Sequence, residues 1–150
     1  MPNEELHLIP DAGASENTVV YKKYDAKGNP LEVELAGGLT VVFLWGHSQS
    51  LPIAKIENTT LSAVLSKFGI TEIQLNNLSE TSMTAINNLR KTLVYANVYT
   101  YTYQPLIGIS TQTDPMGQKT TYEYDPFYRL KNILDSKQNK LINYEYNYMK

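Results

Sequence analysis

An aromatic residue returns along the chain at intervals of 21 or 22 residues, and this repeat constrains the fold more than any other feature. Tyr103, Tyr124 and Tyr146 follow one another at this spacing, and Tyr24 is followed by Trp45 at the same interval. Turn-forming Asp, Gly and Pro residues recur about every ten positions between these anchors, so one repeat predicts strand, turn, strand, turn. Such a unit cannot bury its own apolar face and has to stack on neighbouring units.

Alternation with a period of two identifies the strands. Successive side chains of a strand point to opposite faces, so alternating residues give one apolar or aromatic face and one polar face. The alternating segments are Leu31–Leu35, Tyr99–Tyr103, Thr120–Tyr124 and Tyr144–Tyr148. The predicted turns are Asp25–Pro30, Gly37–Gly38, Asp114–Gly117 and Asp125–Pro126. We therefore expect an antiparallel sheet built from residues 18–56 and 98–148.

Residues 59–97 differ, because they contain no proline and a single glycine, Gly69. Apolar residues at helical spacing predict a first helix with Asn58 or Thr59 as its N-cap and Gly69 as its C-terminal stop. A capping box at Thr71–Gln74 predicts a short second helix, and a third helix is expected after Ser79 or Thr81. The residues expected to be buried in these helices are Leu61, Leu65, Phe68, Ile86, Leu89 and Leu93.

The predicted fold class is thus mainly β with a helical insertion, as one structural domain. Its expected segments are an N-terminal lead-in (1–17), repeat strands (18–58), the helical insertion (59–97) and further repeat strands (98–150).

Composition excludes several functional classes. The 13 basic and 15 acidic side chains give a net charge of −2, whereas nucleic-acid-binding domains and proteins that bind anionic membranes usually have a basic excess. No run approaches the ~18 apolar residues of a transmembrane helix, so membrane insertion is not expected, and the acidic start predicts no signal peptide. The sequence has no cysteine, which excludes disulfides and thiolate zinc sites. No cofactor is predicted.

The repeat motifs resemble the YD repeat of the Rhs (rearrangement hotspot) family. The resemblance rests on Tyr24–Asn29 and on Thr121–Leu130, where a Tyr-Asp pair opens each turn. Over residues 20–58 and 98–148 the chain looks like the C-terminal repeat region of Bacteroidetes-type members. In large members, which include polymorphic toxins, toxin-complex subunits and teneurins and are often secreted or at the cell surface, many repeats form a hollow shell around a toxin or other domain. The resemblance implies an antiparallel YD-repeat strand array, an open fragment of an Rhs-type β shell, with a scaffold role.

Some positions depart from the family pattern. Tyr128 and Gln138 stand where the repeat usually has a turn glycine, and we expect these two turns to be loosened or bent, because a positive φ is costly for other residues. Asp114 matches one half of a self-cleaving Asp-Pro-x-Gly motif, but the second half is missing, so Asp114 is interpreted as a repeat turn. About four repeats are too few to close a shell.

Other groupings of polar residues are weaker candidates for chemistry. His7 and His47 lack the spacing of a metal site, and His7 is expected to face outward from a strand. His47 and Ser48 are adjacent, so in an extended chain they would point apart rather than form a base and nucleophile. The carboxylate pairs Glu123 with Asp125 and Glu32 with Glu34 are interpreted as solvated strand faces rather than acid–base pairs. No catalytic residue is predicted.

The tyrosine rows are the remaining candidates for ligand or interface contacts: Tyr101, Tyr103, Tyr122, Tyr124, Tyr144 and Tyr146. Repetition at the same position in every unit favours packing between strands, and stacking against sugar rings is the alternative.

The preferred function is a non-enzymatic structural or interaction module that helps enclose or present a partner or toxin domain. The alternative is a carbohydrate-binding module that uses the tyrosine face. The expected partners are adjoining YD repeats or another copy of the chain, paired through open sheet edges, with a glycan as the partner in the alternative. Replacement of Tyr146 by proline is expected to weaken pairing through the last strand.

Overall fold

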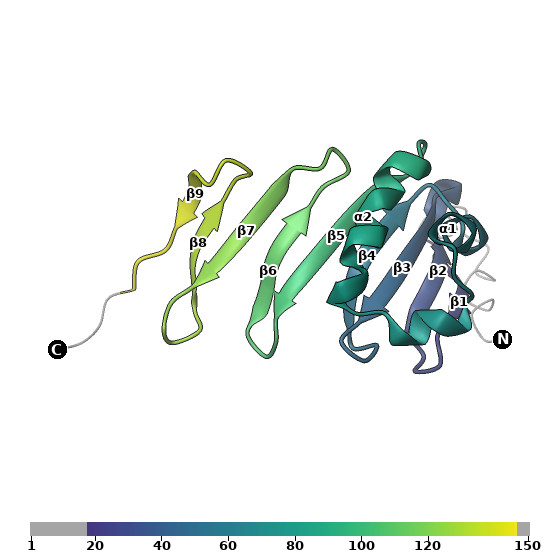
Figure 1. Cartoon of the computed structure of the whole chain (residues 1–150), viewed down its shortest axis with the longest axis horizontal. Coiled ribbons are helices and arrows are strands. Elements are labelled where there is room, and N and C mark those ends of the chain that lie inside the picture. The colour runs from purple at the N-terminus through teal and green to yellow at the C-terminus, as the bar shows by residue number, and fades with distance from the viewer. Residues whose placement is uncertain (1–17, 147–150) are drawn as a thin grey trace. The chain divides into compact units, whose positions relative to one another are not determined.

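The computed structural model describes residues 18–146. They fall into two compact units, the first extending to Val98 and the second beginning at Tyr99. Strands dominate both units, and within each unit consecutive strands pair antiparallel (Figure 1). The predicted fold class, mainly β with a helical insertion, is confirmed.

The strands of the first unit follow one another in sequence order. They are β1 (Val20–Tyr24), β2 (Pro30–Glu34), β3 (Thr40–Gly46) and β4 (Leu51–Glu57). β2 pairs with β3 through Val33 opposite Val41, and β3 pairs with β4 through Val42 opposite Ile56. Among the described strands, only β2 pairs with β1, so the other side of β1 is an edge.

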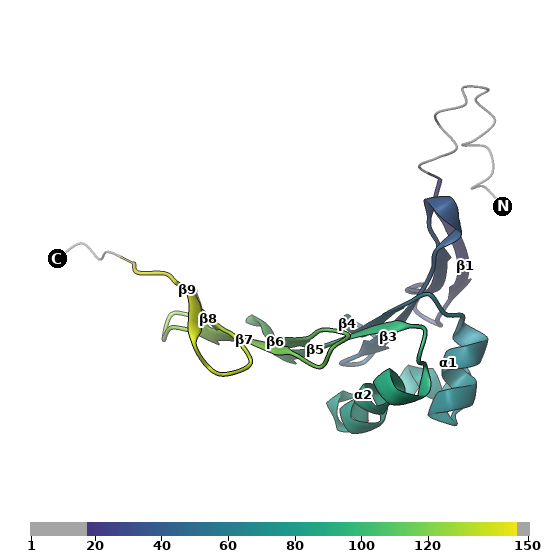
Figure 2. The same cartoon turned by 90° about the horizontal axis from the view of Figure 1, so that it is seen from above.

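Two helices lie on one side of these strands (Figure 2). They are α1 (Leu61–Phe68) and α2 (Met83–Thr92), with short 3₁₀ segments at Ala36–Gly38, Ile73–Asn77 and Glu80–Ser82. No helix within residues 18–146 is long and apolar enough to cross a membrane.

The ends of the helices follow the sequence signals only in part, and the N-cap of α2 is Ser82 rather than Ser79 or Thr81. Gly69 ends α1 with a left-handed φ of 81°, as predicted. The N-cap is Thr60, whose side chain accepts a hydrogen bond from the Ala63 N–H, so the prediction of Asn58 or Thr59 was wrong by one or two residues. The capping box at Thr71–Gln74 opens a 3₁₀ segment rather than an α-helix.

The core of the first unit lies between the helices and β2–β4. Leu61, Ile86, Leu89 and Leu93 are buried, as predicted. Leu65 and Phe68 are only half-buried, and in this they differ from the prediction.

Strand β2 does not alternate strictly between buried and exposed side chains, because Leu31, Glu32 and Val33 are all buried. Its pairing with β1 is also irregular, with register shifts between Tyr21 and Lys23 and between Lys23 and Tyr24. The prediction that Glu32 lies on a solvated face was therefore wrong. Its carboxylate accepts a hydrogen bond from the backbone N–H of Leu61, 3.0 Å away, at the start of α1, which is a favourable position for a negative charge.

The second unit also has its strands in sequence order. They are β5 (Asn97–Gln104), which begins just before the boundary, β6 (Gly108–Thr113), β7 (Lys119–Tyr124), β8 (Leu130–Leu134) and β9 (Lys140–Asn143). Within the described range, β8 is the only strand that pairs with β9.

The predicted strand Tyr144–Tyr148 is wrong over its described part. β9 ends at Asn143, and Tyr144–Tyr146 have no strand structure. The Tyr144 N–H still donates to the Lys131 carbonyl, but the Tyr146 side chain folds back onto the start of β8. Residues 1–17, with the predicted lead-in and the His7 strand, and the end of the predicted last strand lie outside the described residues.

Candidate functional site

Four hairpin turns share one hydrogen-bond pattern built around an aspartate. The aspartate backbone N–H donates to the carbonyl four residues later, and its carbonyl accepts from the N–H three residues later, at 2.8–3.0 Å. Its Oδ1 accepts two further backbone N–H groups, from the residues two and four positions later, at 2.8–2.9 Å. The four residues are Asp25, Asp114, Asp125 and Asp135. The interpretation of Asp114 as a repeat turn is confirmed.

The fourth residue of each turn has a left-handed backbone. Gly28 and Gly117 have φ values of 87° and 85°, and Tyr128 and Gln138 have values of 66° and 68°. The prediction that the two non-glycine turns are loosened was wrong, because they keep all the hydrogen bonds of the glycine turns. The aspartate acceptors hold the turn in place while the left-handed residue carries conformational strain.

These hydrogen bonds lower the pKa of three turn aspartates. Burial by itself would raise the pKa of Asp25 and of Asp125, but hydrogen bonds, above all from the residue four positions later, outweigh it. For Asp135 the backbone hydrogen bond from the residue four positions later is the largest cause and lowers the pKa directly. The charged form is favoured in each case because it accepts the backbone donors.

A second recurring contact joins neighbouring strands of successive repeats. The Trp45 indole Nε1–H donates to the Pro30 carbonyl at 2.8 Å. The hydroxyl of Tyr124 donates to the Ile109 carbonyl at 2.7 Å, and the hydroxyl of Tyr146 donates to that of Leu130 at 2.6 Å. We call this contact the aromatic joint: an aromatic donor at a strand end, or just beyond it, bonded to a carbonyl at the start of the preceding strand.

The joint explains the repeat length. Except for Trp45, which lies opposite Pro52, the aromatic residue lies opposite the residue six positions later: Tyr24 opposite Pro30, Tyr103 opposite Ile109, and Tyr124 opposite Leu130. That opposite residue supplies the carbonyl for the next aromatic, 15 or 16 residues further on. A hairpin step of six followed by a joint step of 15 or 16 gives the observed spacing of 21 or 22.

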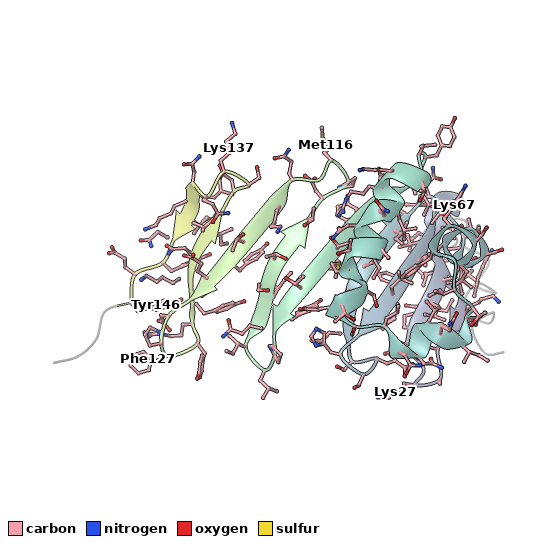
Figure 3. The ribbon with its side chains drawn as sticks, in the orientation of Figure 1. Lys27, Lys67, Met116, Phe127, Lys137 and Tyr146 are labelled. Carbon is pink, nitrogen blue, oxygen red and sulfur yellow. The ribbon has the colours of Figure 1, made fainter. Side chains whose placement is uncertain are left out.

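The surroundings of each joint differ. Beside Tyr124, a Cβ added to Gly108 would lie 2.5 Å from the tyrosine hydroxyl, so the ring occupies space that glycine leaves open. Beside Tyr146, the Arg129 guanidinium lies 4.0 Å from the ring centroid and also 5.4 Å from that of Phe127. Figure 3 shows Tyr146 and Phe127 close together at this end of the second unit.

The six tyrosines singled out from the sequence do not form one exposed row. Tyr124 and Tyr146 are half-buried and use their hydroxyls in joints. Tyr101, Tyr103 and Tyr122 are also half-buried strand residues, and Tyr144 is exposed. The alternation of apolar and polar residues could not reveal the aromatic joints. The usable sequence signal was the 21-residue repeat together with the six-residue distance between paired residues in a hairpin.

The polar residues that were weaker candidates for chemistry include two, His47 and Glu123, whose side chains contact other side chains of the protein. His47 Nε2 lies 3.2 Å from Glu80 Oε2, and Ser48 beside it is exposed. Glu123 accepts a hydrogen bond from the Asn132 side chain at 3.0 Å. Among residues 18–146 no group of three His, Cys, Asp or Glu side chains could hold a metal ion.

Comparison with known proteins identifies the repeat. Residues 109–139 match the family model RHS Repeat, which confirms the predicted resemblance over β6 to β8 and the turns between them. A comparison with curated protein sequences finds no match. Among solved structures, the chain is similar to one in the crystal structure of TcdB2-TccC3-TEV, with 14% sequence identity and a TM-score of 0.31. The match covers 85% of this chain and 8% of that chain.

Proposed function

We propose that the chain is a non-enzymatic structural module, a segment of an Rhs-type repeat assembly in which adjoining repeats continue its sheets. The observation that carries the proposal is the aromatic joint, which recurs at the repeat spacing in both units, as Trp45 to Pro30 in the first and as Tyr124 to Ile109 in the second. A contact that links each repeat to the one before it is a device for building an array. In the assembled protein, this array would help enclose or present a partner or toxin domain.

The polar residues that recur in the repeat support a scaffold role. The carboxylates of Asp25, Asp114, Asp125 and Asp135 accept backbone hydrogen bonds within their own turns. A general acid or base has to reach a substrate proton, whereas these oxygens hold the turn.

The outer sides of β1 and β9 are where adjoining repeats would pair. All four residues of β9 are exposed, including Leu141 and Ile142 at 60% and 44% of their surface. An edge strand offers unpaired backbone groups along its outer side, and an added strand satisfies them.

Glycan binding has less support. A pocket of about 570 Å³ beside Tyr144 and Tyr146 is lined by Asp125, Lys131 and Asn143, among others. One face of the Tyr146 ring is already covered by Arg129, which leaves Tyr144 as the accessible ring for a sugar.

The proposal is tested with a synthetic peptide that copies residues 97–113, the β5–β6 hairpin, added to isotope-labelled full chain. We expect backbone amide resonances of β1 or β9 to shift as the peptide adds a strand. Ile142→Lys should weaken binding at β9, because an edge charge opposes strand addition. Ile73→Lys is the matched control, since Ile73 is 77% exposed and lies outside the strands. The absence of shifts at both edges at the solubility limit of the peptide would contradict the proposal.

A further inference from the structure

Tyr24 occupies the position of the aromatic residue in an aromatic joint, but the hydrogen bond of that joint is not formed among residues 18–146. It ends β1 and opens the Asp25 turn, as Tyr124 ends β7 and opens the Asp125 turn. Within residues 18–146 its hydroxyl forms no hydrogen bond; its ring, 53% exposed, stacks on Tyr21 at 6.1 Å between centroids. A joint needs a strand preceding β1, and none of the described strands lies there.

Next to the turn, the hairpin that carries Tyr24 has the register of the hairpin that carries Tyr124. Tyr24 lies opposite Pro30 and Lys23 opposite Glu32, with a register shift between them. In the second unit Tyr124 lies opposite Leu130 and Glu123 opposite Asn132, again with a shift between them. The two tyrosines are therefore equivalent in strand pairing at the turn as well as in sequence, although β1 has a second register shift between Tyr21 and Lys23 that β7 lacks.

The lysines of β1 are not free charges that would prevent another strand from pairing with this edge. Edge strands often carry lysines that prevent pairing with other strands. Here the Lys22 ammonium lies 2.9 Å from a Glu34 carboxylate oxygen and that of Lys23 lies 3.6 Å from one of Glu72. Both charges are paired within the first unit.

We propose that the outer edge of β1 is the docking site for a strand of another Rhs-type repeat, and that Tyr24 recognises this strand by donating a hydrogen bond from its hydroxyl to a backbone carbonyl at the start of the strand. The proposal rests on the proposed function, and adds to it the recognising residue at β1 and the kind of strand that pairs there.

The three joints among the described residues define the strand that would dock. Their carbonyls belong to Pro30, Ile109 and Leu130, each the first or second residue of a strand that follows a hairpin turn. β6 supplies the best template, since Gly108 before Ile109 leaves room for the tyrosine hydroxyl. β9 of a second copy does not fit this description. Like β3 and β7, it leads to the aromatic donor of a joint, here Tyr146, whereas the carbonyls of the joints belong to β2, β6 and β8.

The test measures binding of the peptide copying residues 97–113 to the full chain at β1, by the amide shifts of that strand. We expect Tyr24→Phe to weaken binding at β1 by about two- to tenfold, the effect of losing one hydrogen bond. Tyr21→Phe, which removes a hydroxyl from the stacked neighbour on the same strand, should leave binding unchanged. A peptide with Gly108→Ala should also bind less tightly, because its added methyl group meets the tyrosine hydroxyl.

The outcomes separate this proposal from the proposed function. Shifts at β9 alone would overturn the β1 site and leave the structural role intact. Equal affinities of the wild type and Tyr24→Phe would overturn the role of the hydroxyl. Slow hydrogen exchange along the outer side of β1 in the free chain at low concentration would show that the chain covers this edge itself, and would overturn docking by another repeat. Fluorescence of Trp45, the single tryptophan of the sequence, checks that each variant keeps the folded first unit.

Discussion

Replacing Tyr128 by glycine should stabilise the second unit. Tyr128 has a φ of 66° at the turn position that Gly117 fills with a φ of 85° in the preceding turn. A left-handed backbone costs a residue with a Cβ about 1–2 kcal/mol. Glycine removes this cost but gives the unfolded chain more freedom, which offsets about 0.4–1 kcal/mol. The net gain in the free energy of unfolding should therefore be about 0.5–1 kcal/mol.

The side chain of Tyr128 has to be separated from its backbone. The ring is 67% exposed, so its removal should cost little, and Tyr128→Ala provides the control because it removes the ring and keeps the left-handed strain. The reverse change, Gly117→Ala, should destabilise the chain by a similar amount. No atom lies within 4 Å of the added Cβ at Gly117, so its cost is conformational only.

The assay is urea unfolding followed by far-UV circular dichroism, with hydrogen exchange of peptides from residues 119–134 to locate the effect. Trp45 lies in the first unit, so its fluorescence reports on that unit and serves as an internal reference. The reasoning would be refuted if Tyr128→Gly were no more stable than Tyr128→Ala, or if Gly117→Ala had no effect.

Three further outcomes are expected. Tyr124→Phe should lower the free energy of unfolding by about 0.5–1.5 kcal/mol through loss of the bond to Ile109 and speed exchange at the start of β6, whereas Tyr128→Phe should not. The stability contributed by the turn aspartates should be complete above their unfolded pKa of about 3.9, and it should be lost as the pH falls through their lowered folded pKa values. The reason is that the unfolded chain then binds protons more readily than the folded chain. In an acid titration, Asp125→Asn should therefore lose stability less steeply than the wild type. A broad hydrolase and glycosidase screen should find no turnover. Reproducible activity that is lost when His47, Asp114 or Glu123 is substituted would contradict the structural role.

Much of the fold could be predicted because its signals are local. The Asp-x-x-Gly turns fix the hairpins through hydrogen bonds within five residues, and Gly69 ends α1 through its own φ. The register shifts of β1 could not be predicted, because they depend on pairing with β2. The burial of Glu32 could not be predicted either, because it depends on a hydrogen bond from Leu61, 29 residues further along the chain.

The interface residues were predicted by type and not by role. The sequence marked Tyr124 and Tyr146 as repeated aromatics, but their carbonyl partners lie 15 and 16 residues earlier on the preceding strand. Tyr146 also lies beyond β9, so Tyr146→Pro would disturb an internal joint instead of testing the outer edge. Tyr24 became a candidate only through its equivalence to Tyr124.

Hydrogen exchange at the backbone amides of β1 and β9 tests the central claim most directly, when measured for the full chain alone and with an excess of the peptide copying residues 97–113. The structural account predicts that outward-facing amides of these edge strands exchange rapidly in the chain alone and become protected when the peptide adds a strand. Protection already present in the chain alone at low concentration, or rapid exchange that the peptide leaves unchanged at both edges, would contradict it.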